Sequence, residues 1–298
     1  MANARPWVGL YLPQIRMSFD TITERSLAAE AAGFDSVWFM DHLWTPGDAT
    51  LDNLEAWTLA AGIAARTTTI RVGHLVLCDA FRSPIVLAKM ASTLDVMSNG
   101  RLELGIGWGS VPSEIAAGGL GEHGAAARAA RLEETLAVLE LAFTGETFSF
   151  DGRFHQIDGA TCRPVPVQRP IPVHIGGAGE KLTLPLVRRF ATWWNVPTYA
   201  VDRLAELRPL VGDNVRVSAQ HPVALVRPGD DRDKVIATAE RRFGNWGGLL
   251  SGEADEIAAA MNAEVAAGVE GFVLQFSDFG TPETLAHFGE AVLPALAG

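Results

Sequence analysis

Cysteine is scarce in this sequence, which contains only Cys78 and Cys162. Two cysteines so far apart give neither a disulfide framework nor the spacing of a zinc site. The 7 histidines include no His-Glu-x-x-His motif and no ligand pair at helical spacing, so we expect no metal site. A Gly-x-Ser-x-Gly element is also missing, which disfavours a hydrolase.

Basic runs and long apolar runs are missing as well. The formal net charge is −11, so we expect no nucleic-acid partner. No apolar stretch reaches the roughly 20 residues that span a bilayer, so we expect no membrane association. The N-terminus has no basic segment followed by an apolar core, so no signal peptide is expected and the cytoplasm is the predicted location. With 298 residues and 48% apolar residues, the composition is typical of a globular protein.

Strand and helix patterns alternate along most of the chain. Short apolar runs predict strands at 8–12, 36–40, 70–77, 102–106, 173–175, 191–196, 215–226 and 271–276. Helical patterns follow at 21–32, 53–66, 84–97, 125–143, 181–190, 202–210, 232–243, 254–267 and 282–297. About eight such units predict an α/β protein, a (β/α)8 TIM barrel in one domain over residues 1–298. A doubly wound open sheet is the alternative.

The predicted fourth strand is followed by an insertion at about 111–170. Residues 113–124 are rich in glycine and alanine without a strong period, whereas 147–156 predict a β-hairpin with a two-residue turn at Asp151-Gly152. A loop that contains glycine and tryptophan is expected at 245–252. Residues 164–172 are rich in proline and indicate an extended linker.

A barrel of this kind carries its site at the C-terminal ends of the strands. Asp41, His42 and Trp44 follow the second predicted strand. Imidazole titrates near neutrality and a carboxylate can orient it, so Asp41 and His42 are a candidate acid/base unit. The alternative is that Asp41 caps a loop and His42 packs beside it.

Glycines follow the fourth and fifth predicted strands. Gly105 and Gly107 would let backbone amides approach a ligand, although they could also simply form a tight turn. The run Gly176-Gly177-Ala178-Gly179 precedes a helix, and with Lys181 it is a candidate phosphate site. A flexible strand–helix turn is the alternative there. The loop residues Trp44, Trp108 and Trp246 are candidates for the walls of an aromatic ligand's pocket.

Taken together, these segments resemble the bacterial luciferase-like monooxygenase superfamily, and most closely its branch that uses the deazaflavin coenzyme F420. The resemblance covers nearly the whole chain in order. Its matching segments are 32–38 with Asp41-His42, 71–73, 82–84, 94–107, 164–166 and Gly176-Gly177.

This resemblance implies a (β/α)8 barrel with a flavin or deazaflavin in its C-terminal mouth. It also implies a bulge with a cis peptide at Leu75-Val76 behind the tricyclic ring. The phosphate would lie at Gly176-Gly177, the glycines after strand four would line the tail, and His42 would face the reactive ring carbon. Relatives are often dimers, so a homodimer is expected.

The sequence departs from this family at two places. Relatives that oxidise sugar phosphates and alcohols carry a glutamate just after the strand-four glycines, where this chain has Trp108 and Gly109. Glu114 is the nearest carboxylate in the sequence and is the remaining candidate for the proton donor. Near strand six, Ala-Thr-Trp-Trp-Asn at 191–195 replaces the more usual Ala-Asp-Gly-Trp-Asn.

The resemblance therefore predicts an oxidoreductase that transfers a hydride between coenzyme F420 and an unidentified small organic substrate. The predicted catalytic residues are His42, Asp41 and Glu114. The predicted cofactor-binding residues are Trp44, Leu75, Val76, Gly105, Gly107, Trp108, Gly176, Gly177, Ala178 and Lys181. One alternative is an FMN-dependent monooxygenase that receives reduced flavin from a partner reductase. Another is a barrel that has lost catalysis and only binds a ligand.

Overall fold

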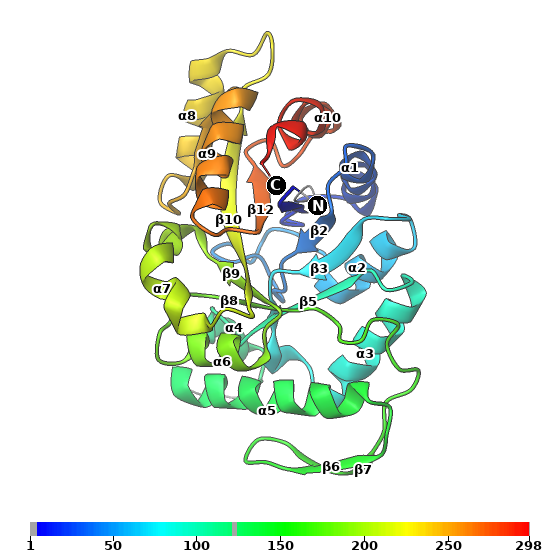
Figure 1. Ribbon diagram of the computed structural model, residues 1–298. Helices are drawn as coiled ribbons and strands as arrows, with labels where there is room; N and C mark the ends of the chain where they lie inside the picture. The colour runs from blue at the N-terminus through cyan, green and yellow to red at the C-terminus, as the bar shows by residue number, and fades with distance from the viewer. Residues whose placement is uncertain (1–4, 121–123, 298) are drawn as a thin grey trace.

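The computed structural model describes residues 5–120 and 124–297, so the ends of the predicted domain and three residues of the predicted insertion lie outside it. A closed barrel of parallel strands forms its centre (Figure 1). In order around the barrel, the strands are β1 (Trp7–Tyr11), β2 (Ser36–Phe39), β3 (Arg71–His74), β5 (Leu102–Gly107), β8 (Val173–Gly176), β9 (Trp193–Val196), β10 (Arg216–Leu225) and β12 (Gly271–Phe276). Because β9 pairs with β10 and β12 pairs with β1, the (β/α)8 prediction is confirmed and the open sheet is excluded.

Helices surround this barrel and connect its strands. They are α1 (Phe19–Ala31), α2 (Ala56–Ala64), α3 (Pro84–Met97), α4 (Pro112–Ala117), α5 (Ala125–Phe143), α6 (Thr183–Phe190), α7 (Leu204–Val211), α8 (Arg232–Phe243), α9 (Ala254–Ala266) and α10 (Pro282–Ala291). Local signals define several of their ends. The Ser83 hydroxyl accepts a hydrogen bond from the Val86 amide before α3, and the Asp231 carboxylate accepts one from the Lys234 amide before α8.

The third predicted strand is interrupted in the structure. It consists of β3 and a two-residue strand, β4 (Leu77–Cys78), separated by a bulge at Leu75 and Val76. β3 and β4 both pair with β5, so the bulge lies beside the middle of that strand and interrupts the pairing there. This bulge is what brings Val76 to the mouth of the barrel.

The segment between β5 and β8 holds α4, α5 and the hairpin β6 (Phe148–Asp151) with β7 (Gln156–Ala160), which lies outside the barrel along α5 (Figure 1). The hairpin is confirmed, but the two-residue turn is wrong because the loop extends over 152–155. Glu134 on α5 causes this, since its carboxylate accepts hydrogen bonds from the amides of Arg153, Phe154 and His155. The short helix α4 was not expected from the sequence.

The loop expected at 245–252 contains a short strand, β11 (Leu250–Gly252). This strand pairs with the C-terminal end of β10.

Aromatic rings fill the middle of the barrel. Trp38 and His174 lie 4.8 Å apart by ring centroids, and His174 stacks on Trp193 at 5.6 Å. The buried Glu103 carboxylate accepts a hydrogen bond from Arg71 and contacts His174 Nε2 at 2.6 Å. The interior of the barrel is therefore a packed core. Within the described ranges, every helix is too short or too polar to cross a bilayer.

Candidate active site

A cavity of about 580 Å³, here named the mouth cavity, opens at the C-terminal ends of the barrel strands. It brings together His42 after β2, Val76 in the bulge and Gly177 after β8. Ten of the predicted site residues line it, namely Asp41, His42, Leu75, Val76, Gly107, Trp108, Glu114, Gly176, Gly177 and Ala178. Segments far apart in the sequence thus meet in a single site.

Three predicted residues do not line this cavity. Trp44 is half-buried beside it, and its amide lies 3.4 Å from Glu114 Oε1. Lys181 is exposed in the turn before α6, which begins two residues later than predicted. Gly105 lies beneath the bulge, where a Cβ atom would come within 1.9 Å of the His74 carbonyl oxygen. Cofactor binding by these three residues stays a prediction.

The bulge between β3 and β4 forms one wall of the mouth cavity. The peptide bond between Leu75 and Val76 is cis, at the position that the family resemblance implies. A Cβ atom on Gly107 would come within 2.9 Å of Val76 Cγ2, so this glycine is needed for the bulge to pack against β5. The two β5 glycines therefore serve the close approach of the bulge, whether or not they also contact a ligand.

His42 and Glu114 form a bonded pair at the edge of the cavity. His42 Nδ1 lies 2.8 Å from Glu114 Oε2, although the two residues are 72 positions apart. The other carboxylate oxygen, Oε1, accepts a hydrogen bond of 2.5 Å from the Leu43 amide. Glu114 is only 3% exposed, so the backbone and the imidazole hold its charge in place. The sequence could not establish this reach, because Glu114 lies on the unexpected helix α4.

Asp41 is bound elsewhere. Its Oδ2 accepts hydrogen bonds from the Cys78 amide at 2.8 Å and from Arg82 Nη1 at 2.7 Å, and its Oδ1 accepts one from Arg82 Nη2 at 3.0 Å. The carboxylate that orients His42 is thus Glu114. This geometry fits the alternative that Asp41 caps a loop. A catalytic role for Asp41 stays a prediction.

The opposite end of the cavity is suited to an anion. The Gly177 amide donates a hydrogen bond of 3.2 Å to the Asn195 carbonyl oxygen. Among the described residues, no acceptor binds the amides of Ala178 and Gly179. Thr183 at the start of α6 accepts a hydrogen bond from Trp108 Nε1 at 3.3 Å. Two free amides before a helix can bind a phosphate oxygen.

Sequence reasoning missed Arg128, which lies on α5 and lines the same cavity. Its guanidinium carbon is 5.1 Å from the centroid of the Trp108 ring, a distance typical of a cation–π contact. Arg128 adds positive charge to the end of the cavity where the free amides lie. No local pattern in the sequence indicates Arg128, because nothing near it shows that the start of α5 lies at the mouth of the barrel.

A second cavity, here named the side cavity, has a volume of about 740 Å³. Tyr11, Met40, His42 and Gln220 line both cavities, so the two spaces share a wall. Burial raises the pKa of the Tyr11 phenol above its usual value, which keeps this group neutral. His42 therefore lines both the mouth cavity and the side cavity.

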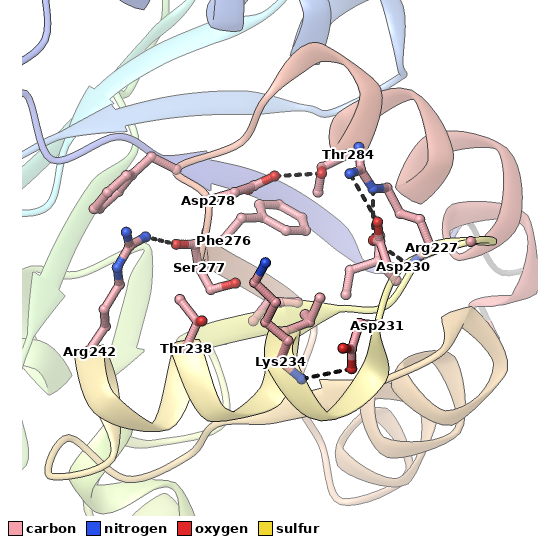
Figure 2. Close-up of a pocket in the computed structure, with 15 residues that line it drawn as sticks. Arg227, Asp230, Asp231, Lys234, Thr238, Arg242, Phe276, Ser277, Asp278 and Thr284 are labelled. Atoms are coloured by element: carbon pink, nitrogen blue, oxygen red, sulfur yellow. Dashed lines mark hydrogen bonds and ion pairs between the residues drawn. The ribbon is translucent and has the colours of Figure 1, made fainter.

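A third hollow, with a volume of about 580 Å³, lies between α8 and the ends of β10 and β12; Figure 2 shows its lining residues. In this hollow Arg227 Nε donates to Asp230 Oδ2 at 3.1 Å, and Thr284 Oγ1 donates to Asp278 Oδ2 at 2.6 Å. None of the predicted site residues lines it. Across residues 5–120 and 124–297, no group of three His, Cys, Asp or Glu side chains is arranged to hold a metal.

Comparisons with known proteins bear on this site. The family model for luciferase-like monooxygenases matches residues 1–288. An F420-dependent glucose-6-phosphate dehydrogenase of Nakamurella multipartita is 31% identical over 262 residues, which cover 84% of this chain and 71% of that protein. The protein of the same name from Gordonia bronchialis is 35% identical over 174 residues, or 57% of this chain and 49% of that protein. In such matches the chain spans about half the length of the curated relatives.

Solved structures share the fold at lower identity. An F420-dependent secondary alcohol dehydrogenase in complex with an F420-acetone adduct has a TM-score of 0.80 at 18% identity, covering 98% of this chain and 99% of that one. A coenzyme F420-dependent tetrahydromethanopterin reductase from Methanopyrus kandleri has a TM-score of 0.79 at 19% identity, covering 99% and 100%. At such identities the likeness shows the fold alone. Since the family model matches nearly the whole chain, the protein belongs to the luciferase-like monooxygenase family.

Proposed function

We propose that this chain is an oxidoreductase that transfers a hydride between coenzyme F420 and a small organic substrate. The observation that carries this proposal is the single cavity shared by His42, Val76 and Gly177. The relatives of the chain that are named F420-dependent support the choice of coenzyme. The homodimer and the cytoplasmic location remain predictions.

The residues of the mouth cavity fit a deazaflavin. Leu75, Val76 and Trp108 offer apolar surface for a flat ring, and the amides of Ala178 and Gly179 with Arg128 offer donors and charge for its phosphate. When bound there, the deazaflavin accepts or supplies the hydride. The protein contributes orientation and the exclusion of water.

His42 is placed to move the accompanying proton. Its Nδ1 is bound to Glu114, which leaves Nε2 for a substrate oxygen. As the hydride leaves an alcohol carbon, Nε2 would take the hydroxyl proton, and in the reverse direction it would return that proton to a carbonyl oxygen. The buried Glu114 carboxylate stabilises the imidazolium that this transfer produces. Trp108 cannot take up this proton, because its indole N–H only donates hydrogen bonds and has no acceptor atom.

The test is a titration of the purified chain with F420 and, in parallel, with FMN, followed by absorbance at the deazaflavin band in the presence of a panel of alcohols and carbonyl compounds. We expect F420 to bind, and to bind more tightly than FMN. Tighter binding of FMN with oxygen uptake on addition of reduced FMN would favour the monooxygenase alternative, and no binding of either would refute both.

A variant pair tests whether the barrel is catalytic. His42→Ala should leave F420 affinity within about threefold but lower hydride transfer by about 100-fold or more, because a positioned acid/base group typically contributes 10²–10⁴-fold. His287→Ala on α10 is the control, since His287 lines neither cavity. A barrel without catalysis would show no difference among the three proteins.

A further inference from the structure

The side cavity has an unusual charge for this protein. Three arginines line it, Arg16, Arg25 and Arg242, and no carboxylate residue is among its described lining residues. The chain as a whole carries a formal net charge of −11, so this excess of positive charge is local. A cavity lined by charge of one sign raises the local concentration of ligands of the opposite sign.

Two of these arginines are fixed by the loop after β12. Arg25 Nη1 donates to the Phe279 carbonyl oxygen at 2.5 Å, and Arg242 donates to the Ser277 carbonyl oxygen. Figure 2 shows Arg242 reaching from α8 to this carbonyl. A guanidinium has five N–H donors, so these bonds orient the groups and leave other donors for a ligand.

Two carboxylates attract Arg25 from outside the cavity. They belong to Asp278 and Glu24, and neither residue lines the cavity. The carboxylate of Asp278 accepts hydrogen bonds from the hydroxyls of Thr281 and Thr284 and from the Gly280 amide. Its oxygens are thus occupied within their own loop.

The rest of the side cavity is largely apolar. Phe243 and Trp246 pack with ring centroids 5.1 Å apart, and the Arg242 guanidinium lies 4.9 Å from the centroid of the Phe279 ring. The Thr198 hydroxyl donates to the Trp246 carbonyl oxygen at 2.8 Å, which holds the loop that carries this tryptophan. Trp246 is 46% exposed here, as expected for a ring that gains burial when a ligand enters.

A buried polar group also points to a ligand. Gln275 on β12 lines the side cavity and is only 3% exposed. Its Oε1 atom has no hydrogen-bond partner among the residues that the structure describes. A buried carboxamide oxygen without a partner is destabilising, and a ligand hydroxyl or N–H would supply the missing hydrogen bond.

We infer that the side cavity binds the substrate, and that this substrate is an organic anion with an apolar ring or chain. The anionic group would contact the arginines and the apolar body would lie against Phe243, Trp246 and Phe279. Gln275 Oε1 would accept a hydrogen bond from any hydroxyl or N–H that the substrate carries. This inference rests on the proposed function, because the shared wall at His42 is what makes the occupant a substrate.

The experiment compares three probes by calorimetric titration of the full chain, with and without saturating F420. The probes are 2-naphthoate, the uncharged 2-naphthylmethanol, and glucose 6-phosphate, an anion without an apolar body. We expect 2-naphthoate to bind at least about tenfold more tightly than the other two, because a charge-assisted hydrogen bond and apolar burial then act together.

Two neighbouring arginines on α8 provide matched variants. Arg242→Gln should weaken 2-naphthoate about tenfold and leave 2-naphthylmethanol within twofold. Arg241→Gln should change neither, because Arg241 does not line the cavity and its Nη2 binds Thr238 Oγ1. Trp246→Ala should weaken both naphthyl probes.

Several results would overturn the inference: no binding of 2-naphthoate in either condition, equal binding of the two naphthyl probes, tighter binding of glucose 6-phosphate, or an Arg242→Gln effect equal to that of Arg241→Gln. The titration without F420 separates this inference from the proposed function. Failure of F420 to bind would refute the proposed function while the naphthoate result still stood.

Discussion

The ion pair between Asp41 and Arg82 should stabilise the wall of the mouth cavity, because it joins the loop after β2 to the segment after β4. The Asp41 carboxylate is 5% exposed, and Arg82 contacts both of its oxygens, at 2.7 and 3.0 Å. Removing one partner of a buried pair leaves an uncompensated charge, which typically costs 3–5 kcal/mol. Arg82→Met should therefore lower the free energy of unfolding by about 3–5 kcal/mol and the thermal midpoint by about 5–8 °C.

The assay is urea denaturation followed by circular dichroism, with thermal unfolding as a second measurement. Arg203→Met is the control, since Arg203 makes an ion pair with Glu206 and Glu180 on the exposed surface, and its midpoint should match that of the parent. The double variant Asp41→Asn/Arg82→Met should recover part of the loss, because it removes the stranded charge and keeps an acceptor for the Cys78 amide. If Arg82→Met unfolds with the parent and with Arg203→Met, the reasoning about this pair is wrong.

Three further predictions follow from the geometry. Glu114→Gln should slow hydride transfer by about 5–30-fold with F420 affinity unchanged, because the difference between charge-assisted and neutral hydrogen bonds is about 1–2 kcal/mol. The exposed Glu140→Gln is the control, and equal rates would contradict the role of Glu114. Arg128→Met should weaken the binding of F420 about tenfold and leave the binding of a deazaflavin that lacks the phosphate unchanged, as measured by fluorescence titration. An equal loss of affinity for both ligands would instead indicate that Arg128 contacts the ring. Burial lowers the pKa of His74 to about 4, so between about pH 6.5 and 4 the unfolded chain binds more protons than the folded chain. Stability should therefore fall as the pH drops through that window, by about 3 kcal/mol from this residue, and His74→Phe should flatten the dependence in denaturant titrations at several pH values; an unchanged slope would be inconsistent with a neutral His74.

The fold was largely predictable from the sequence because its signals are local. Ser83 and Pro84 begin α3, and Asp231 begins α8, each with a capping hydrogen bond that the residue types indicate. The strand β12 matches its predicted residues, since it is a continuous apolar run of the kind that parallel sheets bury. The alternation of about eight strand and helix patterns was enough to predict a barrel.

Elements that depend on distant contacts were not predictable in this way. The turn of the hairpin is displaced because Glu134, on another element, binds three amides of the loop. The partner of His42 is Glu114, on a short helix without a strong apolar period. Arg128 and Gln220 reach the mouth only because the chain folds back there. A single sequence shows which residues end a strand, but not which of them face each other.

The most direct test of the account is a crystal structure of the chain with F420. We expect the deazaflavin ring beside the Leu75–Val76 bulge, with one face toward His42, and its phosphate within about 3 Å of the amides of Ala178 and Gly179. Electron density for the coenzyme outside the mouth cavity, or with its phosphate away from these amides, would contradict the central claim that this cavity is built for a tricyclic ring and its phosphate.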